Sequence, residues 1–149
     1  MSEAARRRLE VDELLCFAIY SAGHAFNRVY KPLLDALGLT YPQYLVMLAL
    51  WGEDGQTVGS LGEKLFLESS TLTPLIKRLE GMGYVARSRD PADERQVRVR
   101  LTRSGAALRA KASDVPACIL DATGMSVSTL RKLQDEISTL RDNLLKAAS

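Results

Sequence analysis

The chain has 149 residues, about the size of one domain, and 46% of them are hydrophobic, which excludes disorder of the whole chain. No apolar run approaches the roughly 20 residues of a membrane-spanning helix, and no apolar segment follows the first arginines. We therefore expect a cytoplasmic protein without a signal peptide or membrane contact. The formal net charge is only +2, but residues 77–103 carry eight basic and four acidic side chains, so the positive charge is local.

A first helix is expected over residues 12–30, because apolar residues recur there at steps of three and four. Asp12 is expected to cap its start, and Pro32 to end or kink it before a short second helix. Residues 40–51 predict the next helix, with Thr40 as its cap.

Two short helices close together are predicted next, over residues 58–67 and 69–83, the latter capped by one of its first two serines. The period then changes to alternation in residues 84–88 and 96–102, which predicts a two-stranded ribbon joined by a polar, proline-containing turn. Alone such a ribbon is marginal, so we expect it to pack on the helices.

The C-terminal part is predicted to be helical from Ser104, with an interruption at Pro116 and an end near Gly124. Ser126 is expected to cap the last helix. In that helix apolar residues step by three and four, as in a seam between helices: Leu130, Leu133, Ile137, Leu140 and Leu144.

Two short helices followed by a basic hairpin are the order of a winged helix-turn-helix, so the predicted fold class is mostly α with a small two-stranded β wing. A helix fits the major groove of DNA, where exposed polar and basic side chains reach bases and phosphates. The candidates for this role are Ser69, Ser70, Thr71, Thr73, Lys77 and Arg78. At the hairpin tip, Arg95 is a candidate for a minor groove, with Asp93 holding its guanidinium. The alternative is an ordinary solvated basic face.

The two cysteines, Cys16 and Cys118, are expected to be reactive rather than structural in a reducing compartment. A free cysteine has a pKa near 8.5, and only the thiolate attacks a peroxide. A sensing thiol therefore needs a lower pKa, which hydrogen-bond donors provide because they stabilise the anion. The alternative is that each is an inert, small apolar residue. His24 is the only histidine, and metal-ligand spacing is absent, so we predict no metal site and no cofactor.

Three stretches, "LTYPQYLVMLALW", "SSTLTPLIKRLEGMGYV" and "RDPADERQVRVRLT", resemble the MarR-type winged-helix regulators. The stretch "LCFAIYSAGHAFNRVYKPLL" resembles their organic-hydroperoxide-sensing, OhrR-like branch. The resemblance implies one MarR-like domain over residues 1–149, with dimerisation helices at about 12–34 and 104–147 and a DNA-binding part at about 40–102. It implies a homodimeric repressor on a palindromic double-stranded operator, and not an enzyme.

The resemblance also implies a sensing site at Cys16. Tyr30 and Tyr41 of the neighbouring chain would donate their hydroxyls to its sulfur. Organic hydroperoxides would oxidise Cys16 to a sulfenic acid and then to an intersubunit disulfide with Cys118, which would release the DNA. The expected apolar surroundings, which would favour organic hydroperoxides over hydrogen peroxide, are Phe17, Ile19, Tyr20, Phe26, Met47 and Trp51.

Two other functions remain open at this stage. One is a regulator of the same fold that is released by a small aromatic ligand, with Cys16 incidental. The other is a small thiol peroxidase, although nothing in the sequence resembles the arginine or threonine expected beside a turnover thiol.

Overall fold

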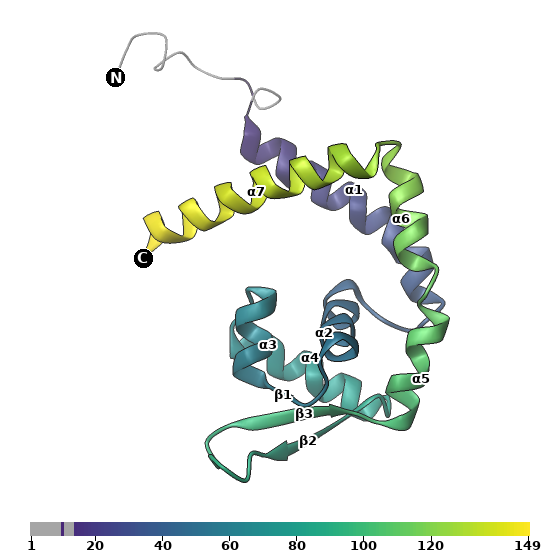
Figure 1. The fold of residues 1–149 in the computed structure, drawn as a ribbon, viewed down its shortest axis with the longest axis vertical. Coiled ribbons are helices and arrows are strands. Elements are labelled where there is room, and N and C mark those ends of the chain that lie inside the picture. Colours follow the sequence, from purple (N-terminus) through teal and green to yellow (C-terminus); the bar gives the residue numbers. More distant parts are fainter. Residues whose placement is uncertain (1–9, 11–13) are drawn as a thin grey trace. The chain divides into compact units, whose positions relative to one another are not determined.

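The computed structural model describes residue 10 and residues 14–149, which form helices and one small antiparallel sheet (Figure 1). In chain order the elements are α1 (Leu15–Asp35), α2 (Tyr41–Gly52), β1 (Gln56–Thr57), α3 (Val58–Leu65), α4 (Ser69–Gly81), β2 (Val85–Arg89), β3 (Val97–Leu101), α5 (Arg103–Lys111), α6 (Val115–Thr123) and α7 (Val127–Ala148). They fall into two compact units, one ending at Ser113 and the other comprising Asp114–Ser149. This mostly helical chain with a small sheet confirms the predicted fold class.

The core of the first unit lies where the short helices meet the sheet. Its fully buried side chains come from α2, α3, α4 and β3, and they include Leu50, Leu61, Leu72, Ile76, Leu79 and Val99, each 0% exposed. Burying a side chain of this size contributes about 1.5–3 kcal/mol. The core therefore holds these three helices and the sheet together as one unit. In the described part of the chain, no helix is long and apolar enough to cross a membrane.

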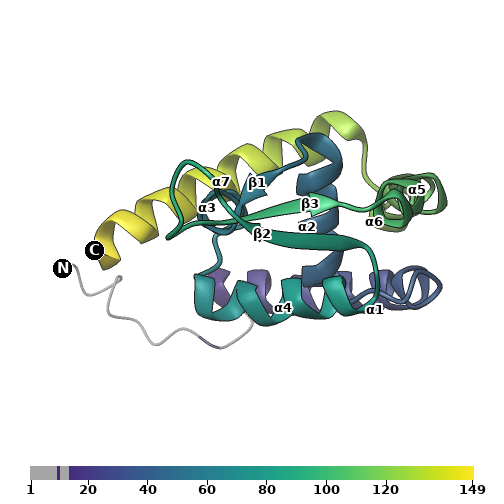
Figure 2. The same ribbon diagram turned by 90° about the horizontal axis from the view of Figure 1, so that it is seen from below.

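The sheet has one strand more than the sequence predicted. Strand β3 pairs antiparallel with β2 on one side and with the two-residue β1 on the other (Figure 2). The buried side chain of Gln56 explains the added strand, because its Nε2 donates to the carbonyls of Ala49 at 3.0 Å and Glu53 at 2.8 Å. These two bonds fix the loop after α2, and Gln56 can then pair with Val99.

Several predicted helix ends are confirmed. Thr40 caps α2, and Gln43 completes a capping box with it: the Gln43 N–H donates to Thr40 Oγ1, and the Thr40 N–H donates to Gln43 Oε1. Ser126 caps α7 by accepting from the Thr129 N–H. The structure also places Gly83 after α4 with a φ of 85°, a left-handed conformation that favours glycine.

Other helix ends were predicted wrongly. Helix α1 runs through Pro32 to Asp35, so there is no separate second helix. The proline removes one hydrogen bond only a turn before the end, and burial of Leu34 offsets that loss. At α4 neither serine is the cap, because Glu68 takes the N-cap position without a side-chain bond. Asp12 lies outside the described residues.

Candidate functional site

The exposed face of α4 carries the polar residues that the sequence singled out. Ser69, Ser70, Thr71, Lys77 and Arg78 are exposed and Thr73 is half-buried. The opposite face of the helix is the core stripe of Leu72, Ile76 and Leu79. Met82, which follows the last residue of α4, is 39% exposed. The arrangement leaves the start of α4 and its basic side chains open to a partner.

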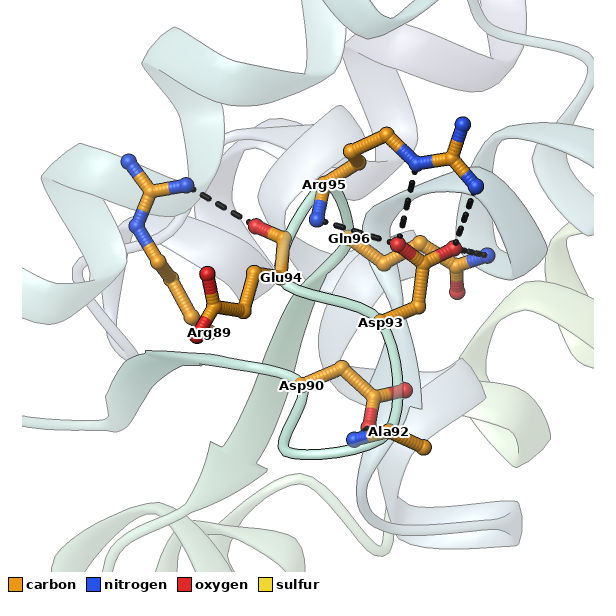
Figure 3. Close-up of polar contacts among 7 residues, drawn as sticks. All are labelled: Arg89, Asp90, Ala92, Asp93, Glu94, Arg95 and Gln96. Carbon is orange, nitrogen blue, oxygen red and sulfur yellow. Dashed lines mark hydrogen bonds and ion pairs between the residues drawn. The ribbon is translucent and has the colours of Figure 1, made fainter.

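The tip of the hairpin between β2 and β3, the wing, presents Arg95 in a fixed geometry (Figure 3). Asp93 Oδ1 accepts from Arg95 Nε at 3.1 Å and from the Arg95 backbone N–H at 3.2 Å. The Arg95 side chain is nevertheless 91% exposed. The predicted pairing of Asp93 with Arg95 is confirmed, and it orients a cation toward the outside.

The base of the wing contains an ion pair that the sequence reading missed. Arg98 donates to Asp90 Oδ2 at 2.8 Å and to the Gly55 carbonyl, and Asp90 is buried. The pKa of Asp90 is lowered, mainly by the hydrogen bond from the Ala92 N–H and next by the hydrogen bond from the Arg98 guanidinium. The only sequence signal was the alternation of β3, which placed Arg98 on the polar face of the ribbon.

A second ion pair joins α4 to the wing. Glu80 accepts from the Arg87 backbone N–H at 3.0 Å and from Arg87 Nε at 3.1 Å. These hydrogen bonds lower the pKa of Glu80. The bond from the Arg87 backbone N–H has the larger effect, and the bond from the Arg87 side chain comes second. Because Arg87 belongs to β2, the end of α4 and the first wing strand are tied together.

An open cleft of about 580 Å³ separates the start of α4 from the wing. It is lined by the first residues of α3, by Ser69 and Thr73 of α4, and by Arg95 and Gln96 of the wing. Polar side chains and Arg95 thus face one concave surface from two sides.

Cys16 lies on α1 and is exposed, as are the four predicted apolar neighbours on the same helix. The exposed fractions are 39% for Phe17, 38% for Ile19, 64% for Tyr20 and 45% for Phe26. Large apolar side chains rarely stay exposed together on one helix unless another surface covers them. The N-terminal half of α1, which is exposed around most of its circumference, therefore has the character of an interface.

Tyr30 and Tyr41 lie together, with ring centroids 4.8 Å apart, and Tyr44 adds a third ring 6.0 Å from Tyr30. Tyr30 is on the same continuous helix as Cys16 but fourteen residues later, which is about 21 Å along the helix axis. A tyrosine side chain does not span that length. Tyr30 therefore cannot reach Cys16 of its own chain.

Burial raises the pKa of these phenols above its ordinary value of 10. Desolvation, followed by the nearby Tyr41 and Tyr44, raises the pKa of Tyr30 to about 12. Desolvation also raises the pKa values of Tyr41 and Tyr44. All three hydroxyls thus remain donors at neutral pH. Sequence reasoning overlooked Tyr44, although it stands three residues after Tyr41 on one helix.

Met47 and Trp51, expected beside the thiol, have other surroundings within their own chain. Met47 is 0% exposed in the core, and Trp51 Nε1 donates to the Gly105 carbonyl at 2.9 Å. Cys118 is exposed on α6, in the second unit. Among the residues that the structure describes, no group of three or more histidine, cysteine or acidic side chains is placed to hold a metal ion.

A family model for the transcriptional regulators SarA and Rot matches residues 28–111. The organic hydroperoxide resistance transcriptional regulator of Bacillus subtilis (strain 168) is 43% identical over 136 residues, which is 91% of this chain and 92% of that protein. The HTH-type transcriptional regulator TtmR of Methylorubrum extorquens (strain PA1) is 50% identical over 134 residues, which is 90% of this chain and 69% of TtmR.

Solved structures of AbfR, a protein of Staphylococcus epidermidis, are also similar. Reduced AbfR bound to DNA is 35% identical, with a TM-score of 0.75 over 87% of this chain and 90% of that chain. The disulfide-formed AbfR is 37% identical, with a TM-score of 0.64 over 89% of this chain and 90% of that chain.

Proposed function

Because this chain belongs to the MarR- and SarA-type winged-helix transcriptional regulators, we propose that it is a homodimeric repressor whose grip on operator DNA is released by oxidation of Cys16. The observation that carries the proposal is the distance of about 21 Å between Cys16 and Tyr30 along α1. It requires that any phenol of Tyr30 acting on the thiol comes from a second chain.

The DNA contacts follow from the exposed face of α4 and from the wing. The start of α4 enters a major groove, where Ser69, Ser70 and Thr71 reach base edges, while Lys77 and Arg78 bind phosphates. Arg95 enters the adjacent minor groove in the orientation that Asp93 gives it. The reduced, DNA-bound state of AbfR supports this part of the proposal.

The dimer covers the apolar faces that the single chain leaves exposed. On α1 these are Phe17, Ile19 and Phe26, and on α7 they are Leu133, Ile137 and Leu144. In the dimer, Tyr30 and Tyr41 of the partner donate their hydroxyls to the Cys16 thiolate. The aromatic surroundings of the Cys16 thiolate favour its reaction with organic hydroperoxides over hydrogen peroxide.

The chemistry of release has two balanced steps. The Cys16 thiolate attacks the distal oxygen of a hydroperoxide, the O–O bond breaks, and Cys16 becomes a sulfenic acid while the alkoxide leaves and takes up a proton from water to give the alcohol. The Cys118 thiol of the partner then displaces water and forms a Cys16–Cys118 disulfide. The disulfide-formed state of AbfR supports such an end point. Formation of the disulfide shifts the helices, so that the two wings no longer match the spacing of the operator half-sites in the cytoplasm.

The proposal is tested with a labelled palindromic duplex, whose half-sites lie about 10 bp apart, in a fluorescence anisotropy assay. One equivalent of cumene hydroperoxide releases the native protein, and a thiol reductant restores binding. Cys16→Ser stays bound under the same conditions. On a non-reducing gel the oxidised native protein runs as a dimer, and Cys118→Ser as a monomer. Equal release of the native protein and Cys16→Ser by the hydroperoxide would contradict the proposal.

A further inference from the structure

The wing has a buried anchor beneath its tip. Arg98 of β3 donates to Asp90 at the start of the wing loop and to the carbonyl of Gly55, in the loop before β1. Asp90 Oδ1 in turn accepts from the Ala92 N–H at 2.9 Å. One guanidinium therefore joins three segments of the chain, and Asp90 lies directly below the loop that carries Asp93 (Figure 3).

The segment at the far end of this anchor is itself fixed. Asp54 Oδ1 accepts from the N–H groups of Gly55 and Leu101, both at 2.8 Å. Gly55 has a φ of 72°, and a Cβ there would lie 3.1 Å from a nitrogen of Arg100, so the position suits glycine. The wing loop is thus connected through Arg98 to a segment that is held by its own hydrogen bonds.

The two members of the anchor face inward, unlike the residues at the wing tip. The side chains of Arg98 and Asp90 are 29% and 11% exposed, whereas that of Arg95 is 91% exposed. Resting on the function proposed above, we propose that Asp90 and Arg98 are positioning residues, which set the wing loop so that Arg95 meets the DNA without touching the DNA themselves.

If Asp90 acts only through its charge, replacing it should strengthen DNA binding; if it positions the wing loop, replacing it should weaken DNA binding. Replacing an aspartate by asparagine on a DNA-binding surface removes a repulsion, which by charge alone tightens binding. If Asp90 instead holds the loop through Arg98, Asp90→Asn leaves a half-buried guanidinium without its counter-charge and loosens the wing. The sign of the change in DNA affinity therefore decides between the two roles.

The chain offers a matched control on the same loop. Glu94 is exposed, and Glu94→Gln changes the charge by the same amount without touching the anchor. A second variant, Arg98→Lys, keeps the charge but loses the planar fork that bonds Asp90 and Gly55 together. Arg95→Ala supplies the reference for loss of the tip contact.

The experiment measures the dissociation constant for the reduced full-length protein on the operator duplex at several salt concentrations. We expect Asp90→Asn and Arg98→Lys to weaken binding by about fivefold or more, within the range known for single DNA contacts. Glu94→Gln should bind at least as tightly as the native protein. In an Arg95→Ala background the effect of Asp90→Asn should largely vanish, because the contact that it positions is gone.

Vanishing of the effect in the double variant is a readout that general destabilisation does not produce. If Asp90→Asn fails to fold, Arg98→Lys and its combination with Arg95→Ala decide the question. Asp90→Asn binding as tightly as Glu94→Gln, or weakening equally with and without Arg95, overturns this inference alone. A native protein that binds no duplex, or an Arg95→Ala variant that binds like the native protein, counts instead against the proposed function.

Discussion

An arginine that enters a groove of DNA has to be exposed and held in place at the same time. Arg95 meets both conditions, since its side chain is 91% exposed and its Nε is bonded to Asp93 at 3.1 Å. Such an exposed pair contributes little to folding stability, about 0–1 kcal/mol. Its value lies in reducing the conformational freedom that Arg95 would otherwise lose on binding. The thiol of Cys16 differs, because the groups expected to hold it belong to another chain.

At the residue scale, the tyrosines are predicted to control peroxide reactivity. Tyr30→Phe removes a hydrogen bond to a charged sulfur, worth about 1.5–3 kcal/mol, so Cys16 should react with cumene hydroperoxide about tenfold more slowly or worse. Tyr44→Phe is the control, because Tyr44 is only 2% exposed and so offers almost no surface to a second chain. The rate is followed as loss of free thiol at neutral pH in the Cys118→Ser background. Equal rates for the two variants would argue against donation by Tyr30.

At the element scale, the winged part depends on close approaches between backbone segments. The start of α5 lies against the end of the turn after α4, where the Thr102 N–H donates to the Tyr84 carbonyl at 3.1 Å. The Gly105 carbonyl also accepts from Trp51 of α2. A single position therefore joins α5, α2 and the beginning of the wing.

Gly105→Ala is predicted to disrupt this junction. A Cβ at Gly105 would lie 2.0 Å from the Tyr84 carbonyl oxygen, so the backbone has to move, at a cost of about 2 kcal/mol or more. The control is Gly81→Ala at the end of α4, where nothing lies within 4 Å of the added Cβ and where alanine is neutral or stabilises by up to about 1 kcal/mol. Urea unfolding measures both. A Gly105→Ala variant as stable as the native protein would show that the approach is not restrictive.

Sequence patterns predicted the elements well where the cause was local. The caps at Thr40 and Ser126 depend on residues within one turn, and both were predicted. Local reasoning failed at Pro32, because burial of Leu34 in the core stabilises the last turn of α1. It also failed at β1, because the side chain of Gln56 donates to a carbonyl of α2.

The candidate site was predicted unevenly for the same reason. The polar face of α4 and the Asp93–Arg95 pair follow from short spacings, and the structure has both. The anchor between Asp90 and Arg98 joins residues eight apart through a turn whose path no periodicity reveals. Met47 and Trp51 were assigned to the thiol because they are apolar, yet α2 is apolar on most sides and packs into the core of its own unit.

At the scale of the whole molecule, the single chain leaves apolar side chains of α1 and α7 exposed. Helix α7 has 22 residues, none of them buried in the described chain. A helix with an apolar stripe and no burial gains little from its own hydrogen bonds in water. The exposed stripe and the exposed face of α1 together favour assembly with a second copy.

Ile137→Glu is therefore predicted to weaken the dimer. It places a charge among the exposed apolar residues of α7, whereas Thr139→Glu places the same charge two residues on, on the other side of the helix. Sedimentation at micromolar concentration should show more monomer for Ile137→Glu and an unchanged dimer for Thr139→Glu. If neither variant shifts the dimer, α7 is not part of the interface.

The reactivity of Cys16 itself tests the central claim most directly. In Cys118→Ser protein, the second-order rate constant with cumene hydroperoxide is measured for the folded chain and for the same chain unfolded in urea. The account predicts a folded thiol that reacts at least about 100-fold faster, equivalent to roughly 2.7 kcal/mol of transition-state stabilisation, and that prefers the organic hydroperoxide to hydrogen peroxide. A folded thiol that reacts no faster than the unfolded one would contradict the account.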